Sequence, residues 1–229
     1  MNNFKKWQEG VFAVFEKIKK HNRPYNIKFG NLQITVLPNV FSPKYFTDSF
    51  WFAEQVSKLV KNKSLLEIGT GTGIIAITCA IKEARVVATD INPTAVKNAK
   101  LNAKKYGLDI KIRKGDIYST IKEAEKFEFI FWNHPFNNWK LEVKEVLLKA
   151  GFDTEYKSLK TYISEAHKHL TLDGRLLLGT GDGADIKEIK KIAQENNYGL
   201  KLLKETTLPI TEGGNIKNKY LIYEFVALI

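Results

Sequence analysis

The sequence predicts an α/β protein built on a parallel sheet. Between residues 64 and 132, short apolar runs alternate with segments of helical spacing. A glycine-rich turn directly follows the first apolar run, and a hydrophobic content of 44% in 229 residues is ample for one core. We therefore expect an α/β domain over residues 64–229, preceded by a basic extension over residues 1–63 that holds a helix, a β-hairpin and a linking helix.

The extension begins with residues 3–20, where apolar side chains recur at helical spacing. This helix is expected to pack on the core or to cover a cleft. Residues 29–36 predict a small hairpin with its turn at Gly30-Asn31. Residues 48–61 predict a second helix, whose apolar face contains Phe52, Val56, Leu59 and Val60.

The main domain starts with alternating strands and helices. Such alternation is typical of a parallel sheet, because parallel neighbours need a crossover connection that is usually a helix. The expected order is strand 64–69, helix 73–82, strand 85–90, helix 93–106, strand 109–113, a short helix near 119–125 and strand 127–132.

The pattern of the C-terminal part predicts further strands and helices of the same sheet. Residues 137–154 are expected to shape a substrate pocket, with a short helix or strand at 141–147. The elements expected after it are helix 155–170, a turn at 172–175, strand 175–180, helix 184–197, strand 199–206, a hairpin turn within 211–219 and a last strand at 220–228.

The most informative motif is LLEIGTGTGII, residues 65–75, in which Glu67 precedes three glycines at alternate positions. A glycine turn between a strand and a helix lets a ligand approach the backbone, and the helix start offers free N–H groups. A dinucleotide fingerprint needs a third glycine where Ile74 stands, and a P-loop needs a lysine that is absent here. A tight turn without a ligand is the alternative interpretation.

The pattern E-x-G-x-G-x-G resembles motif I of class I S-adenosylmethionine (SAM) methyltransferases. Asp90 ends the next strand 21 residues after Gly69, where an acid binds ribose hydroxyls; its alternative is a plain helix cap. Gly115-Asp116-Ile117 resembles the family's adenine-binding loop. The resemblance implies SAM as cofactor, bound by Thr47, Glu67, Gly69, Thr70, Gly71, Gly73, Asp90, Ile91, Asn92, Asp116, Ile117 and Asn133.

The resemblance also implies the overall architecture. Class I methyltransferases have a Rossmann-like fold with three layers, αβα, around a seven-stranded sheet. Their last strand is antiparallel and lies between strands five and six. The helix, strand, hairpin and strand with which this chain ends fit that arrangement.

A second motif, N-H-P-F at residues 133–136, follows strand 127–132. It resembles the [ND]-P-P-[YFW] motif of enzymes that methylate amide or exocyclic nitrogens. The resemblance implies that the Asn133 side-chain oxygen and the His134 carbonyl accept N–H groups of the acceptor, and that Phe136 stacks on its plane. The predicted catalytic set is therefore Asn133, His134, Pro135 and Phe136.

His134 departs from this motif, because it replaces the first proline. Pro135 still favours an extended residue before it. We interpret the imidazole as a wall of the pocket or as a polar group without a role, and not as a general base. The alternative for Asn133 is that it only begins a turn before Pro135.

Upstream, residues 27–48 resemble HemK-type glutamine methyltransferases, in which a hairpin precedes P-R-P-[DE]-T-E. Pro43, Thr47 and Asp48 match that signature, whereas Lys44, Tyr45 and Phe46 depart from it. The whole resemblance covers about residues 27–181. It places Thr47 and Asp48 near the methionine end of SAM, and the alternative is that Thr47 caps the following helix.

The acceptor is left open by these motifs. About 26 residues precede the hairpin, too few for the docking domain of release-factor methyltransferases. A protein glutamine and an RNA base, free or on the ribosome, are balanced hypotheses, with a small molecule as a third. A non-catalytic SAM-binding or RNA-binding module is the alternative class, because His134 alters the motif.

The net charge of +11 is uneven, since residues 1–64 hold 11 basic and 4 acidic residues. A basic arm is typical of contact with RNA or ribosomes, although only four of the 36 basic residues are arginine. No apolar run is long enough for a membrane helix, so we expect a cytoplasmic protein without membrane contact. The single Cys79 excludes a disulfide within the chain, and no metal site is predicted. The oligomeric state is not fixed by the sequence.

Overall fold

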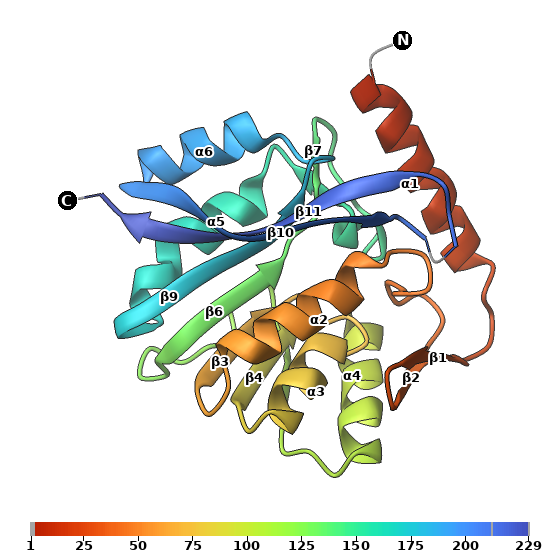
Figure 1. The fold of residues 1–229 in the computed structure, drawn as a ribbon, viewed down its shortest axis with the longest axis horizontal. Helices are drawn as coiled ribbons and strands as arrows, with labels where there is room; N and C mark the ends of the chain where they lie inside the picture. The colour runs from red at the N-terminus through yellow and green to blue at the C-terminus, as the bar shows by residue number, and fades with distance from the viewer. Residues whose placement is uncertain (1–2, 212, 229) are drawn as a thin grey trace.

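A central seven-stranded sheet organises the protein in a computed structural model, which describes residues 3–211 and 213–228 (Figure 1). Its order is β10-β11-β9-β6-β3-β4-β5. The strands are β3 (Ser64–Ile68), β4 (Arg85–Asp90), β5 (Lys111–Lys114), β6 (Phe127–Asn133), β9 (Leu170–Gly181), β10 (Tyr198–Pro209) and β11 (Lys217–Ala227).

Five of these strands run parallel, from β5 through β4, β3 and β6 to β9. The last strand, β11, is antiparallel to both β9 and β10 and lies between them. This confirms the predicted Rossmann-like methyltransferase fold. Because every parallel strand points the same way, the carboxyl ends of β3, β4 and β6 meet at one edge of the sheet.

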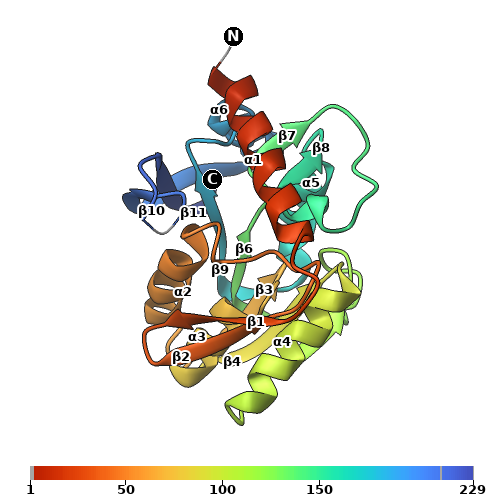
Figure 2. The ribbon, with the colours of Figure 1, turned by 90° about the vertical axis from the view of Figure 1, so that its right-hand side faces the viewer.

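Helices cover both faces of the sheet, which gives three layers (Figures 1 and 2). Leu65 and Leu66, neighbours on β3, point into different cores, as the period of a strand requires. The core on the Leu65 side contains residues of α2 (Asp48–Leu59), α3 (Ile74–Ile81) and α4 (Pro93–Lys105). The core on the Leu66 side contains residues of α5 (Lys157–Glu165) and α6 (Ile186–Glu195).

The predicted hairpin forms from β1 (Tyr25–Phe29) and β2 (Leu32–Val36), with Gly30 at a φ of 55° in its turn. Two buried asparagines of α4 hold it. Asn98 donates to the carbonyl of Thr35 at 2.7 Å and accepts from the N–H of Leu37 at 2.7 Å. Asn102 donates to the carbonyls of Thr35 and Thr72 at 2.8 and 2.9 Å. The hairpin is thus connected to the glycine loop through Asn102.

The first helix, α1 (Asn3–Lys19), lies across β7 (Asn137–Trp139) and β8 (Phe152–Thr154) (Figure 2). Its buried Phe15 packs in a third core with Phe46, Leu147 and Phe152. Lys19 forms ion pairs of 2.8 Å with Glu16 and 2.7 Å with Glu145. The helix is therefore packed on the segment that follows N-H-P-F; the side chains of Phe4, Lys5 and Lys6 lie outside the described residues.

One short helix was predicted wrongly. Residues 119–125 form turns because side chains take over their backbone bonds. Arg113 donates to the carbonyl of Thr120 at 2.9 Å and to the carboxylate of Glu125 at 2.7 Å. The Glu125 carboxylate also accepts the N–H of Lys122 at 2.9 Å.

Other boundaries differ as well. Residues 141–147 form neither a helix nor a strand, and the helix predicted over 155–170 is α5 followed by a 3-10 turn, Ala166–Lys168. The predicted turn at 172–175 is part of β9, which begins at Leu170 and pairs there with Phe127. The pairing with β6 is irregular in this stretch, and Leu172 is fully exposed.

Candidate active site

A cavity of about 590 Å³ opens at the carboxyl ends of β3, β4 and β6. Ligands of open α/β sheets bind at this edge, and the volume lies in the usual range for ligand pockets. Most residues of the predicted site line it: Glu67, Gly69, Thr70, Gly71, Asp90, Ile91, Asn92, Asp116, Ile117, Asn133, His134, Pro135 and Phe136. Thr47 and Gly73 do not.

The glycine loop presents its backbone to this cavity. Gly71 has a φ of +56°, and no heavy atom lies within 4 Å of the place where a Cβ would stand. A ligand therefore has room to approach it. Gly69, at a φ of +67°, is required by packing instead, because a Cβ there would lie 2.9 Å from Nε1 of Trp132.

Asp90 fastens this loop from the neighbouring strand. One carboxylate oxygen accepts the N–H of Gly71 at 2.8 Å, and the other accepts the N–H of Asn92 at 2.8 Å. Asn92 in turn caps α4 by accepting the N–H of Thr94 at 2.9 Å. Burial raises the pKa of Asp90 to about 6, while the two backbone bonds oppose that rise.

Glu67 is the most strongly perturbed acid of the cavity. Burial raises its pKa to about 8, the bond that it accepts from the Thr70 hydroxyl at 2.7 Å opposes the rise, and the nearby Asp90 adds to it. Two buried acids with raised pKa values beside a glycine loop are typical of a ligand site.

Glu67 should make stability depend on pH. Its folded pKa lies above its unfolded value of 4.5, so its burial as a carboxylate costs stability increasingly as pH rises towards 8. The buried His134, whose pKa falls to about 3, acts oppositely, but only below about pH 6.5. We expect the ligand-free protein to lose several degrees of melting temperature between pH 6.5 and 8.5, and Glu67→Gln to remove most of that loss.

A matched control is Glu128→Gln. The salt bridge with Lys63 lowers the pKa of Glu128, so the stability it contributes is lost only below the ordinary carboxylate range. Above pH 6.5, the melting temperature of this variant should fall with pH as steeply as that of the wild type. If the melting temperature of Glu67→Gln also fell with pH as steeply as that of the wild type, the role given to Glu67 would be contradicted.

The second half of the cavity contains N-H-P-F. Asn133 ends β6, and its side-chain N–H donates to the carboxylate of Asp48 at 2.9 Å. Its side-chain oxygen is thereby left for a ligand. Phe136 is half-buried, and its ring lies 5.7 Å from His134 and 6.4 Å from Tyr220.

His134 is a buried wall of the cavity, as the sequence suggested. Its Nε2 lies 2.9 Å from the hydroxyl of Thr180, and its backbone N–H donates to Gly179 at 3.3 Å. Burial lowers the pKa of the imidazole to about 3. A base of that pKa carries too little proton affinity to serve general-base catalysis at neutral pH.

Aromatic and aliphatic side chains close the half of the cavity that contains N-H-P-F. They come from α1, from residues 41–46 and from residues 143–152: Trp7, Val11, Phe15, Phe41, Phe46, Val143, Val146, Leu147 and Phe152. Phe12 extends this wall, because its ring stacks on that of Phe152 with 4.2 Å between the ring centroids and meets that of Trp139 edge-on with 5.2 Å between them. The helix predicted to pack on the core or cover the cleft does both.

Unpartnered polar atoms gather around this cavity. Within the described residues, six buried side-chain nitrogen or oxygen atoms have no hydrogen-bond partner. Four of them belong to residues that line the cavity: Trp7, Thr72, His134 and Asn137. Buried polar groups are usually paired, so the residues around this cavity hold an unusual share of the unpaired polar atoms.

Asp116 and Ile117 line the cavity just after β5. Asp116 is exposed, and its backbone N–H is held by the Ser119 hydroxyl at 2.8 Å. Ile117 is buried with a φ of +44°, a conformation that a β-branched residue adopts only under strain. Backbone strain of this kind clusters at ligand sites.

Thr47 lies beside the site and not in it. Its hydroxyl donates to the carbonyl of Pro209, and its N–H donates to Ile210 at 2.9 Å. It stands at the N-cap position of α2 but makes no side-chain cap bond. The next residue, Asp48, was expected near the methionine end of SAM from its match to the HemK-type signature, and in the structure it lines the cavity.

The described residues also bear on metal binding and on membrane insertion. Within residues 3–211 and 213–228, no group of three or more His, Cys, Asp or Glu side chains is placed to hold a metal ion. None of the helices in those ranges has both the length and the apolar character needed to cross a membrane.

Comparison with known proteins identifies the family. Residues 31–194 match the family Methyltransferase small domain. The match covers more than half of the chain, so the chain belongs to this family of SAM-dependent methyltransferases. The predicted resemblance and cofactor class are confirmed.

Individual relatives differ in their acceptors. A candidate protein N5-glutamine methyltransferase of Methanocaldococcus jannaschii is 39% identical over 48% of this chain and 54% of its own. A ribosomal RNA small subunit methyltransferase C of Haemophilus influenzae is 30% identical over 64% of this chain and 41% of its own. The chain spans about half the length of these curated relatives.

Among solved structures, a T. thermophilus 16S rRNA methyltransferase in complex with AdoMet and guanosine has the same fold. The two structures superpose with a TM-score of 0.63 at 18% sequence identity, over 88% of this chain and 50% of that chain. At this identity the likeness concerns the fold alone.

Proposed function

We propose that this protein transfers the methyl group of SAM to a planar amide or amine nitrogen. The observation that carries the proposal is the orientation of Asn133 at the end of β6. Its N–H is held by Asp48 at 2.9 Å, which leaves its oxygen as a hydrogen-bond acceptor in the cavity. An acceptor nitrogen that donates to this oxygen is positioned for attack on the methyl group.

The chemistry explains why such an oxygen is needed. The lone pair of an amide or aryl amine is delocalised, and acceptors that hold its N–H bonds favour the pyramidal nitrogen that attacks the sulfonium. A ring such as Phe136 keeps the planar group in place. Catalysis then depends on positioning and electrostatics, without a covalent intermediate on the protein.

The cofactor half supports SAM in the same cavity. Gly71 offers an unobstructed backbone, Asp90 a carboxylate for ribose hydroxyls and Asp116 a rim acid for the adenine. The buried Glu67 lies beside the glycine loop, and a positively charged methionine end near it would lower its pKa and favour its ionised form. SAM would supply an electrophilic methyl group on its sulfonium.

The acceptor is proposed to be a protein glutamine or an RNA base. Both classes occur among the relatives, and the cavity is open enough for the end of a side chain or a single base. Either must enter past the apolar wall formed by α1, residues 41–46 and residues 143–152.

The test is mass spectrometry of cell extracts incubated with methyl-labelled SAM, with and without ribonuclease. Label on digested nucleosides or on glutamine supports transfer to RNA or protein, respectively. SAM binding in a calorimeter without transfer to any fraction would favour the alternative of a non-catalytic module.

The basic arm allows a second measurement. Lys17 and Lys20 of the α1 region are exposed, whereas Lys19 is engaged in ion pairs. If the acceptor is RNA, exchanging Lys17 and Lys20 for glutamine should raise KM about threefold or more, leave kcat unchanged and flatten the salt dependence of binding.

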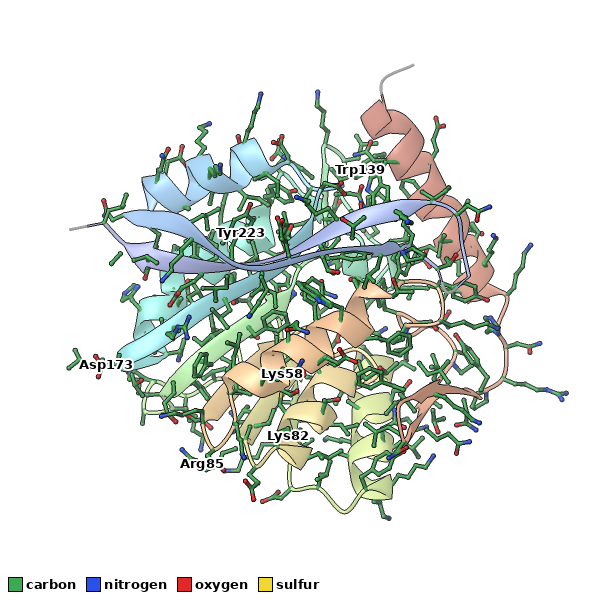
Figure 3. All side chains as sticks on the ribbon, viewed as in Figure 1. Lys58, Lys82, Arg85, Trp139, Asp173 and Tyr223 are labelled. Carbon is green, nitrogen blue, oxygen red and sulfur yellow. The ribbon has the colours of Figure 1, made fainter. Side chains whose placement is uncertain are left out.

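The control is the same exchange at Lys58 and Lys82, which are exposed on the α2 and α3 side of the protein, away from α1 (Figure 3). It removes the same charge at a distant place. An equal rise of KM in both double variants would indicate general charge, and no rise in either would favour a peptide or small-molecule acceptor.

A further inference from the structure

Asp48 and Asn133 meet in the cavity although 85 residues separate them in the chain. Asp48 is the first residue of α2, is 4% exposed and lines the cavity beside N-H-P-F. Asn133 ends β6, and its Nδ2 lies 2.9 Å from Oδ2 of Asp48. The contact links the helix that follows the hairpin to the predicted catalytic loop.

We propose that Asp48 is a positioning residue, whose ionised carboxylate fixes the orientation of the Asn133 amide for methyl transfer. This inference rests on the proposed function. An ionised carboxylate only accepts hydrogen bonds, so the NH₂ group of Asn133 must face Asp48. The Oδ1 atom of Asn133 then faces away from Asp48, towards the acceptor nitrogen.

Protonation of Asp48 reverses this preference. A carboxylic acid donates one hydrogen bond, and the Oδ1 atom of Asn133 is the better partner for it. The Asn133 amide could then rotate and present its NH₂ group to the acceptor. Two donors would face each other, and the acceptor nitrogen would lose the bond that aims its lone pair.

The surroundings hold Asp48 in place. The backbone of Thr47 is fixed to Ile210 at 2.9 Å, and the hydroxyl of Ser49 lies 3.5 Å from Oδ1 of Asp48. Tyr220 of β11 is the titratable group that interacts with Asp48 electrostatically. No ion pair to Asp48 occurs in the described part of the chain, and burial raises its pKa to about 6. The proposed switch therefore falls in an accessible pH range.

The first test needs no acceptor. In the ¹⁵N-labelled ligand-free protein, the side-chain NH₂ signal of Asn133, assigned by its loss in Asn133→Ala, should shift with pH around 6. In Asp48→Asn that titration should disappear. A signal that does not titrate in the wild type, or that titrates equally in both proteins, would overturn the inference.

The second test uses label transfer from SAM to the extract fraction that accepts it. The wild-type rate at saturating SAM should fall below about pH 6, and Asp48→Asn should lower the rate about tenfold or more at pH 7.5 and lose the acid limb. SAM affinity should change less than about threefold. A structural role alone would lower the folded fraction without removing the acid limb.

A double-variant comparison separates positioning from packing. Because Asp48 acts through Asn133, adding Asp48→Asn to Asn133→Ala should lower the rate no further. The matched control is Asp153→Asn. Asp153 is also a buried acid of the cavity, but its carboxylate accepts the backbone N–H groups of Ser158 and Leu159 at 3.1 and 2.9 Å.

The effect of Asp153→Asn should add to that of Asn133→Ala. Additivity of Asp48→Asn with Asn133→Ala would overturn the inference while leaving the proposed function intact. Absence of transfer by the wild type to every fraction, with SAM bound, would instead overturn the proposed function, and the inference with it.

Discussion

Asn133→Ala is expected to lower turnover about a hundredfold or more while SAM affinity stays within a few fold. The variant removes the side-chain oxygen that faces the acceptor, and a hundredfold loss corresponds to about 2.7 kcal/mol of transition-state stabilisation. Asn133 lies at the junction of the two halves of the cavity, and its bond to Asp48 shows which end of its amide is available.

The measurement is the single-turnover rate of label transfer, together with SAM titration in a calorimeter. Asn196→Ala is a matched control, because that amide donates to Ile192 at the end of α6, away from the cavity. It should leave both quantities unchanged. Retained transfer in Asn133→Ala would show that N-H-P-F is only a turn.

Local patterns explain which parts of the site were predictable. The glycine loop, Asp90 and N-H-P-F each follow an apolar strand directly, and a parallel sheet brings the ends of its strands together. Their meeting in one cavity therefore follows from spacing and fold class. The antiparallel β11 between β9 and β10 was predicted by resemblance, not by any local pattern.

Long-range contacts explain what was not predictable. The bond between Asp48 and Asn133 depends on how α2 packs beside β6, and no sequence spacing encodes it. The same holds for the ion pair of Lys19 with Glu145, which ties α1 to the segment after N-H-P-F. By sequence, Lys19 counts as part of a basic arm, whereas in the structure it holds α1 in place over the cavity.

The failed helix at 119–125 shows a different limit. Helical spacing and propensity describe local preference, whereas here Arg113 and Glu125 bind the backbone carbonyl of Thr120 and the backbone N–H of Lys122. Ile117 and Ile121, which would lie on a helical face by spacing, are buried in the second core from a turn. Tertiary side-chain bonds outweigh local preference in this loop.

Asp90→Ala is expected to weaken SAM binding by about a hundredfold or more. Charge-assisted bonds from one carboxylate to ribose hydroxyls contribute on the order of 1.5–3 kcal/mol each. The structure adds a second reason, because Asp90 also holds the N–H groups of Gly71 and Asn92 at 2.8 Å. Without it the glycine loop loses the contact that fixes its backbone towards the cofactor.

The two contributions can be separated by comparing Asp90→Asn with Asp90→Ala. Asparagine keeps one acceptor oxygen for the loop but loses the charge and one acceptor, so its affinity for SAM should lie between those of the wild type and Asp90→Ala. Asp185→Ala is the control for general stability, since that acid caps α6 through the N–H of Glu188 at 3.0 Å, outside the cavity. It should lower the melting temperature without changing the SAM dissociation constant. Equal SAM affinity in wild type and Asp90→Ala would show that SAM does not bind at the end of β4. The half of the cavity beside the glycine loop would then bind another ligand.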